Sequence, residues 1–151
     1  EGLQNGATFT TWFYANSDGG GNAGEIFNKG DHTYCKTTNE SGGYMTIHCD
    51  IYSASSATAF TDAISTNTWH HLTLSLDNSE TNPSLTIYID GKSLGSTSGS
   101  ASTDTDTDDL LIGGSSAANF DGQIDDFRIY NHTLTGTQVK TIYNNGAVYF
   151  K

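Results

Sequence analysis

Residues 120–131 read Phe-Asp-Gly-Gln-Ile-Asp-Asp-Phe-Arg-Ile-Tyr-Asn, and this stretch carries the strongest structural information in the chain. Its apolar residues do not keep one alternating register, because Ile124 and Phe127 have opposite parity. A β-strand can move its apolar residues to the other parity only by inserting an extra residue, so we predict a β-bulge at Asp125–Asp126. The bulge would turn two adjacent carboxylates out of the simple alternation. These carboxylates either protect a sheet edge and pair with Arg128, or serve as calcium ligands near a binding rim.

Two further segments, residues 69–76 and 84–89, alternate with a period of two and are typical of half-buried strands. The dipeptide Asp90-Gly91 that follows the second segment is typical of a two-residue hairpin turn. A single short helix is predicted to begin at Thr135, because Thr135 and Gln138 have the spacing of a capping box. These patterns indicate a predominantly β chain with one helix near its C-terminal end.

The bulk composition fits one polar β-domain and argues against some classes of partner. The chain of 151 residues is long enough to bury a core, and its hydrophobic content of 34% suits a sandwich with solvated strand faces. Six basic residues stand against 17 acidic ones, which gives a formal net charge of −11. Nucleic-acid binding is not expected, because phosphates are neutralised by clustered Lys and Arg. No window of about 18 apolar residues occurs, so no membrane insertion is expected.

The two cysteines, Cys35 and Cys49, flank the turn sequence Ser41-Gly42-Gly43. A hairpin centred at Gly42 would place the two cysteines directly opposite each other. We therefore predict a cross-strand disulfide, with two buried free thiols as the alternative. A zinc site is not favoured, because no second cysteine pair or spaced histidine pair completes a tetrahedral set.

Several segments resemble the laminin-G-like, concanavalin A-like jelly-roll domains. Residues 120–131, a short helix and the ending Tyr143-Asn144-Asn145-Gly146 are similar to the C-terminal signature of that family. Further matching segments occur upstream in the expected order, namely Thr8–Phe13, Trp69–Leu74, Ile87–Lys92 and Leu110–Gly114. The resemblance covers nearly the whole chain and implies an all-β fold, a two-sheet antiparallel jelly-roll sandwich with one short C-terminal helix. We expect residues 1–151 to be one such domain, excised from a larger protein, because Glu1 is neither an initiator Met nor part of a signal peptide.

The sequence offers no convincing catalytic pair, and we predict that the domain is not an enzyme. Glycosidases on related jelly rolls use two closely spaced carboxylates, usually glutamates on one strand. The glutamates of this chain are isolated from one another, at positions 1, 25, 40 and 80. No Gly-x-Ser-x-Gly motif is present, and the only arginine, Arg128, belongs to a predicted strand. The adjacent His70 and His71 would face opposite sides of a strand, which disfavours a shared metal ion.

We predict a carbohydrate site on or beside the cysteine hairpin. Sugar rings pack on aromatic faces, while amides and carboxylates bind the sugar hydroxyls. Tyr44 and Tyr52 have the same parity as His48, so the three side chains would lie on one face of one strand. Tyr34 belongs to the same hairpin and completes the candidate set. The alternative is that these side chains only cover the sandwich.

The resemblance also implies a possible cofactor, since many members of the family hold a calcium ion at the edge of the sandwich. Hard cations need several oxygen ligands that converge from separate segments. The candidate ligands in this chain are Asp31, Asp125 and Asp126. Their meeting in space depends on the tertiary structure.

The sequence therefore predicts a non-catalytic carbohydrate-binding module that tethers an exported enzyme or a surface protein to a polysaccharide or oligosaccharide. Such a module would be extracellular or at the cell surface, and monomeric within a multidomain protein. The charge of −11 favours neutral glycans, with anionic ones bound only through a bridging cation. The alternatives are a calcium-dependent adhesion or protein-interaction domain, which would show a flat apolar patch or a calcium rim, and a structural spacer.

Overall fold

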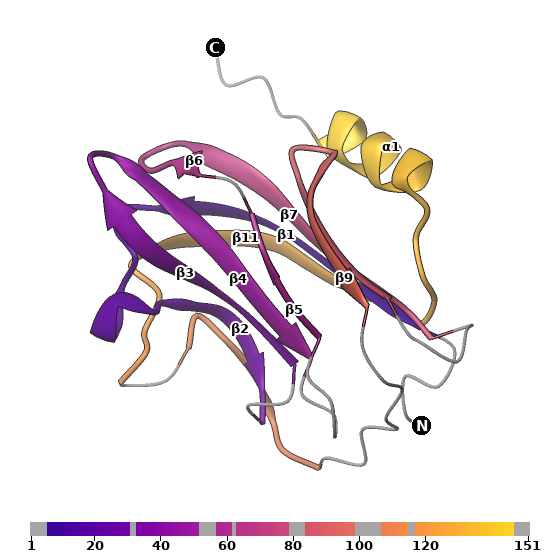
Figure 1. Cartoon of the computed structure of the whole chain (residues 1–151), viewed down its shortest axis with the longest axis horizontal. Helices are drawn as coiled ribbons and strands as arrows, with labels where there is room; N and C mark the ends of the chain where they lie inside the picture. Colours follow the sequence, from indigo (N-terminus) through magenta and orange to yellow (C-terminus); the bar gives the residue numbers. More distant parts are fainter. Residues whose placement is uncertain are drawn as a thin grey trace.

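The computed structural model describes residues 6–30, 33–51, 57–61, 63–78, 84–98, 107–114 and 117–146. Within these ranges the chain forms two antiparallel sheets that face each other, with one α-helix outside them (Figure 1). The five-stranded sheet has the order β11 (Gly122–Tyr130), β1 (Ala7–Ala15), β7 (Trp69–Asp77), β8 (Ser84–Ile89) and β9 (Lys92–Ser98). The predicted all-β sandwich with one short C-terminal helix is confirmed.

The second sheet carries the cysteine hairpin. Its order is β10 (Leu110–Ile112), β2 (Glu25–Lys29), β3 (Thr33–Ser41), β4 (Tyr44–Ile51) and β5 (Ala57–Phe60), with β6 (Ile64–Ser65) also paired to β4. A single 3-10 turn, η1 (Gly20–Asn22), precedes β2 within the described part of the chain. The turn between β3 and β4 uses Gly42 and Gly43, both with positive φ, which glycine adopts without steric cost. We refer to this sheet as the six-stranded sheet.

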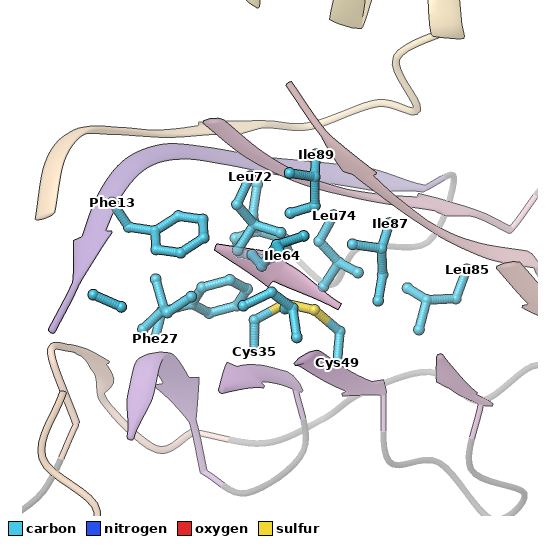
Figure 2. Packing of buried hydrophobic residues seen from close by; sticks show 14 of the residues in the cluster. Phe13, Phe27, Cys35, Cys49, Ile64, Leu72, Leu74, Leu85, Ile87 and Ile89 are labelled. Atoms are coloured by element: carbon cyan, nitrogen blue, oxygen red, sulfur yellow. A yellow bond between two sulfur atoms is a disulfide. The ribbon is translucent and has the colours of Figure 1, made fainter. Parts of the chain in front are cut away.

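The core lies between the two sheets and includes the disulfide. Phe9 of β1 stacks on Phe27 of β2, with ring centroids 5.0 Å apart. Cys35 and Cys49 are paired across β3 and β4, joined by a disulfide and fully buried. Figure 2 shows their sulfur atoms pointing into the space between the layers, towards the apolar side chains of the opposite sheet. Because successive side chains of a strand alternate, the inward cysteines send their neighbours to the outer face of the six-stranded sheet.

The predicted bulge is present and includes Asp126, one of the two residues at which it was predicted. Thr10 pairs with Arg128 and Trp12 pairs with Asp125, so two residues of β11, Asp126 and Phe127, stand opposite one residue of β1. Asp126 has a φ of 52°, which is the left-handed conformation of the inserted residue. The insertion allows Ile124 and Phe127 both to pack against the core despite their opposite parity.

The outer face of the five-stranded sheet is partly covered by residues 131–146, over β1 and β7, and we call it the helix face. Thr8 Oγ1 donates a hydrogen bond to the His132 carbonyl (3.0 Å) and accepts one from the Leu134 amide (2.9 Å). On the helix α1 (Gly136–Gly146), Tyr143 packs against Trp12, with ring centroids 5.7 Å apart. Figure 1 shows α1 over this sheet.

The start of α1 follows the sequence prediction. The Thr135 amide donates to Gln138 Oε1 (2.8 Å), and the Gln138 amide donates to Thr135 Oγ1 (3.3 Å). This reciprocal pair is a capping box, which satisfies amides at the helix N-terminus that have no partner within the helix. Leu134 before the cap and Val139 in the first turn are both buried. No helix in the described part of the chain has the length and apolar character needed to cross a membrane.

Candidate functional site

The predicted carbohydrate-binding residues that the structure describes lie on the outer face of the six-stranded sheet. Tyr34 is on β3, and Tyr44 and His48 are on β4, all with parity opposite to the inward cysteines. Tyr44 is 57% exposed, whereas Tyr34 and His48 are half-buried. Tyr52 lies outside the described residues. We call this outer surface the tyrosine face, defined by Glu25, Asn28, Tyr34, Lys36, Tyr44, Thr46, His48 and Asp50.

Tyr34 is the centre of a polar cluster on this face. Its hydroxyl donates to Asp50 Oδ2 (3.3 Å), and its ring meets the edge of His48 with centroids 5.6 Å apart. The Lys36 ammonium lies 4.9 Å from the centroid of the same ring, in a cation–π contact. Because these contacts hold Tyr34 and occupy part of its ring, the more accessible stacking surface is Tyr44.

The cluster also contains residues that the sequence analysis did not select. Asp50 pairs directly with Tyr34 across β3 and β4, and Lys36 pairs with His48. Lys36 and Asp50 could have been found from the sequence, since they have the same parity relative to the cysteines as the selected residues. No comparable signal was available for the two polar residues contributed by β2.

Those two residues, Glu25 and Asn28, reach the tyrosine face because β2 is irregular. The pairing of β2 with β3 shifts between Glu25 and Phe27, which makes Ile26 an inserted residue. Ile26 is buried in the core. Because Ile26 is an extra residue in the strand, Glu25 and Asn28, three positions apart, both point to the outer face of the sheet. Asn28 Nδ2 donates to Glu25 Oε1 (2.8 Å), and Glu25 pairs in register with Lys36.

Two carboxylate oxygens of this face lack a donor. Glu25 Oε2 and Asp50 Oδ1 are shielded from solvent and have no hydrogen-bond partner among the described residues. A buried acceptor without a donor costs about 1–3 kcal/mol, so a ligand that supplies the donor recovers that energy. The pKa of His48 is lowered by burial and, secondarily, by Lys36, which keeps the ring neutral at neutral pH. The face therefore presents acceptors and one ammonium group.

Of the three predicted calcium ligands, the structure describes Asp125 and Asp126. Arg128 binds both oxygens of Asp126, with Nε–Oδ1 and Nη2–Oδ2 distances of 2.7 Å. Asp125 Oδ1 accepts a hydrogen bond from the Asp126 amide (2.8 Å), and Asp31 lies outside the described residues. Among the residues that the structure describes, no group of three or more His, Cys, Asp or Glu side chains could hold a metal ion. Asp125 and Asp126 alone do not fit a calcium site, and calcium binding stays a prediction.

A chain of contacts at one end of the sandwich has the order of a serine hydrolase triad. His70 Nδ1 is 2.8 Å from Asp90 Oδ2, and His70 Nε2 is 3.2 Å from Ser65 Oγ. However, Nε2 also lies 3.1 Å from the Ser65 carbonyl oxygen, so the ring is directed as much to the backbone as to the hydroxyl. Asp90 Oδ1 accepts the His71 amide (2.9 Å) and so ties the β8–β9 turn to β7. These contacts join three segments of the fold, which is a structural role.

His71 lies on the opposite side of β7 from His70. The His71 ring packs against Trp12 and Tyr143, with centroids 5.2 and 6.1 Å away, under the helix α1. Burial lowers its pKa to about 4 despite the opposing charges of Asp90 and Asp126. The two histidines therefore do not share a ligand, and His71 belongs to the packing of the helix face.

Comparison with known families places this architecture. A family model of the laminin G type, described as the concanavalin A-like lectin/glucanases superfamily, matches residues 2–140. The chain belongs to this superfamily. A search of curated proteins finds no significant match to the domain.

Solved structures with the same fold include known glycan binders. The CBM40 domain of the Ruminococcus gnavus IT-sialidase, bound to α2,3-sialyllactose, has a TM-score of 0.69 at 13% identity, over 93% of this domain and 83% of that chain. Domain 4 of the extracellular arabinanase AbnA of Geobacillus stearothermophilus, in complex with arabinotriose, has a TM-score of 0.63 at 19% identity, over 92% and 66%. The SAP-like pentraxin of Limulus polyphemus has a TM-score of 0.63 at 14% identity, over 95% and 72%. At these identities the likeness shows the fold.

Proposed function

We propose that the domain is a non-catalytic carbohydrate-binding module whose binding surface is the tyrosine face. The observation that carries this proposal is the placement of Tyr34, Tyr44 and His48 on one outer sheet surface, beside two carboxylates that each keep one oxygen without a donor among the described residues. The helix α1 covers the other sheet, so the two outer surfaces are not equivalent (Figure 1). The sialyllactose-bound and arabinotriose-bound relatives support a glycan ligand.

In this proposal an aromatic region and a polar region of the tyrosine face bind different parts of the glycan. Tyr44 offers an exposed ring on which the apolar side of a sugar packs. The cluster around Tyr34 then binds sugar hydroxyls through Lys36, Asp50 and Glu25. A preformed cluster loses little side-chain entropy on binding, which favours affinity.

The cellular role that we propose is tethering. A binding module joined to a catalytic domain keeps that domain near its polysaccharide and raises the local substrate concentration. The disulfide between Cys35 and Cys49 supports an extracellular or cell-surface location, because disulfides persist in oxidising compartments. The AbnA relative is itself a domain of an extracellular enzyme. We propose a monomeric module within a multidomain protein; calcium binding, for which Asp31, Asp125 and Asp126 were the predicted ligands, is tested separately below.

The proposal is tested by a glycan panel probed with the wild-type domain and with two single variants. Tyr44→Ala removes the exposed ring, and we expect a loss of affinity of about tenfold or more. Tyr130→Ala, a tyrosine of β11 in the five-stranded sheet, is the matched control and should bind as wild type. Folding of each variant is checked by circular dichroism.

The same panel is run with calcium and with chelator. Loss of binding in chelator supports a calcium-organised site, and unchanged binding removes calcium from the proposal. Silence of the folded wild-type domain across neutral and anionic glycans contradicts the proposed function. Equal losses for Tyr44→Ala and Tyr130→Ala would place the binding surface elsewhere.

A second function, protein interaction, is favoured by one observation. Ile112 of the edge strand β10 and Ile129 of the edge strand β11 are half exposed, at 51% and 50%. Ile112 pairs with Phe27 and Ile129 pairs with Phe9, and those two rings stack on each other, so both isoleucines lie at the same open side of the sandwich. Ile112→Ser should weaken a protein contact at this edge without changing glycan affinity.

A further inference from the structure

We propose that the tyrosine face takes a neutral, hydroxyl-rich oligosaccharide chain that runs along β4, and that it rejects glycans bearing carboxylate or sulfate groups. This inference rests on the proposed function and specifies the ligand of the same site. It follows from the acceptors of the face, from its few cations and from the length of the polar surface.

The acceptors define the groups that a ligand must offer. Tyr34 is on β3, which lies between β2 with Glu25 and β4 with Asp50. Glu25 Oε2 and Asp50 Oδ1 both lack a donor among the described residues. An ionised carboxylate only accepts hydrogen bonds, so its ligand must donate. The two oxygens are shielded from solvent although their side chains are only half-buried, so binding of a ligand requires a rotation of each carboxylate that exposes its oxygen. Sugar hydroxyls are donors of this kind, and carboxylate or sulfate groups are not.

The cations of the face are too few to bind an acidic sugar. Lys36 is the one cation that the described part of the chain places there, and its ammonium is already over the Tyr34 ring. His48 is neutral at neutral pH for the reasons given above. Arg128, the residue type best suited to bidentate binding of a carboxylate, lies on β11 and is occupied by Asp126. The formal charge of −11 adds repulsion for any anionic ligand.

The dimensions of the face define the size of the ligand. Tyr44 and Asp50 are six residues apart on the same side of β4, which corresponds to about 20 Å. Thr46 and His48 continue the outward row between them. A ligand that packs on Tyr44 and also reaches the cluster around Tyr34 is therefore several sugar units long. This favours an internal stretch of a chain over a terminal monosaccharide.

The test compares matched neutral and anionic chains by isothermal titration calorimetry at low salt. The neutral probes are xylo-, manno-, cello-, galacto- and arabino-oligosaccharides of one to six units. The best neutral binder is then compared with a form that carries carboxylates, either oxidised at its primary alcohols or substituted with glucuronate. Sialyllactose and lactose are a second matched pair. We expect affinity to rise from one to several units and to fall about tenfold or more when carboxylates are added.

Two charge-neutralising variants connect this preference to the face. Glu25→Gln and Asp50→Asn should each weaken binding of the neutral chain about tenfold, as expected for a lost charged hydrogen bond. Each variant should also reduce the ratio of the affinity for the neutral chain to the affinity for the anionic chain. Asp109→Asn, an exposed carboxylate before β10, removes the same charge and should leave both affinities unchanged. Thermal melting of each variant controls for misfolding.

The outcomes separate this inference from the proposed function. Stronger binding to the anionic member of a pair would overturn the inference and leave the carbohydrate-binding function intact. Equal effects of Asp50→Asn and Asp109→Asn would also overturn it, because a general charge effect would then explain the preference. Absence of binding to every probe by the folded domain would overturn both.

Discussion

The two outer faces of the sandwich are built from similar alternating strands, yet they carry different kinds of side chain and different coverage. On the helix face, polar side chains such as Thr8 and Ser75 are buried and bind the backbone of the crossing segment around Leu134. On the tyrosine face, Tyr44 is exposed and Asp50 keeps an oxygen without a donor among the described residues. Polar residues on an outer strand surface thus have a structural role where a segment covers them, and are available for a ligand where none does.

The test with the largest expected effect weakens the packing of the covering segment against the sheet while keeping its backbone hydrogen bonds. Leu134→Ala deletes a buried side chain, and we expect the free energy of unfolding to fall by about 2–5 kcal/mol. Glycan affinity of the remaining folded protein should not change. Tyr44→Ala should show the reverse pattern. Its free energy of unfolding should change by about 0.5 kcal/mol or less, and its glycan affinity should fall clearly. Denaturant melts and calorimetry on both variants measure the pattern, and equal behaviour of the two would contradict the division of roles.

A second test uses the pH dependence of stability on the helix face. The His71 pKa lies at about 4 in the folded domain against 6.5 in the unfolded chain, because burial under Trp12 and Tyr143 disfavours the charged ring. Above pH 6.5 neither state holds the proton, so the His71 contribution is fully present there. It is lost as pH falls from 6.5 towards 4, because the unfolded chain binds the proton first.

At pH 5 this loss should be about 2 kcal/mol relative to pH 7.5, from about 1.4 kcal/mol per pKa unit. Denaturant melts of wild type and His71→Gln over this range provide the measurement. The variant should show a flatter profile in that window. An unchanged slope in His71→Gln would assign the pH dependence to other groups, and the prediction would be wrong.

The smallest test concerns the start of the covering helix. Thr135→Ala removes the hydroxyl of the capping box, and the expected cost is about 1 kcal/mol of unfolding free energy. Because Thr135 is exposed and distant from the six-stranded sheet, glycan affinity should stay at the wild-type value. Thr137→Ala, two residues further into the helix and also exposed, is the matched control and should cost less. A loss of glycan affinity in Thr135→Ala would mean that the helix supports the binding surface.

Much of the fold was predictable because its signals are local. The capping box at Thr135 and Gln138 depends on contacts three residues apart, and the change of parity between Ile124 and Phe127 requires an inserted residue wherever the strand is placed. The predicted pair Asp125–Asp126 includes the left-handed residue, Asp126, but parity alone did not show that its partner in the bulge is Phe127 rather than Asp125.

The candidate site was predicted less completely because its contacts are not local. Shared parity placed Tyr44 and His48 on one face of a strand, and Tyr34 was included because it belongs to the same hairpin, but the sequence did not identify Tyr34 as a residue held by Lys36 and Asp50. Glu25 reaches the cluster only through the insertion at Ile26, for which the sequence has no parity signal.

By itself, the sequence determined that this chain is predominantly β, with a cysteine hairpin and a helix near its C-terminal end, because strand alternation, turn residues and caps act over a few residues; the two-sheet sandwich was implied by the family resemblance. Only the tertiary structure decided which outer face the segment around Leu134 covers and, within the described part of the chain, which carboxylates keep an oxygen without a donor. That decision depends on where the segment around Leu134 crosses the sheet and on the register between β2 and β3. Both arise from pairings between residues far apart in the chain, and alternation specifies two faces of a strand without specifying what packs on either.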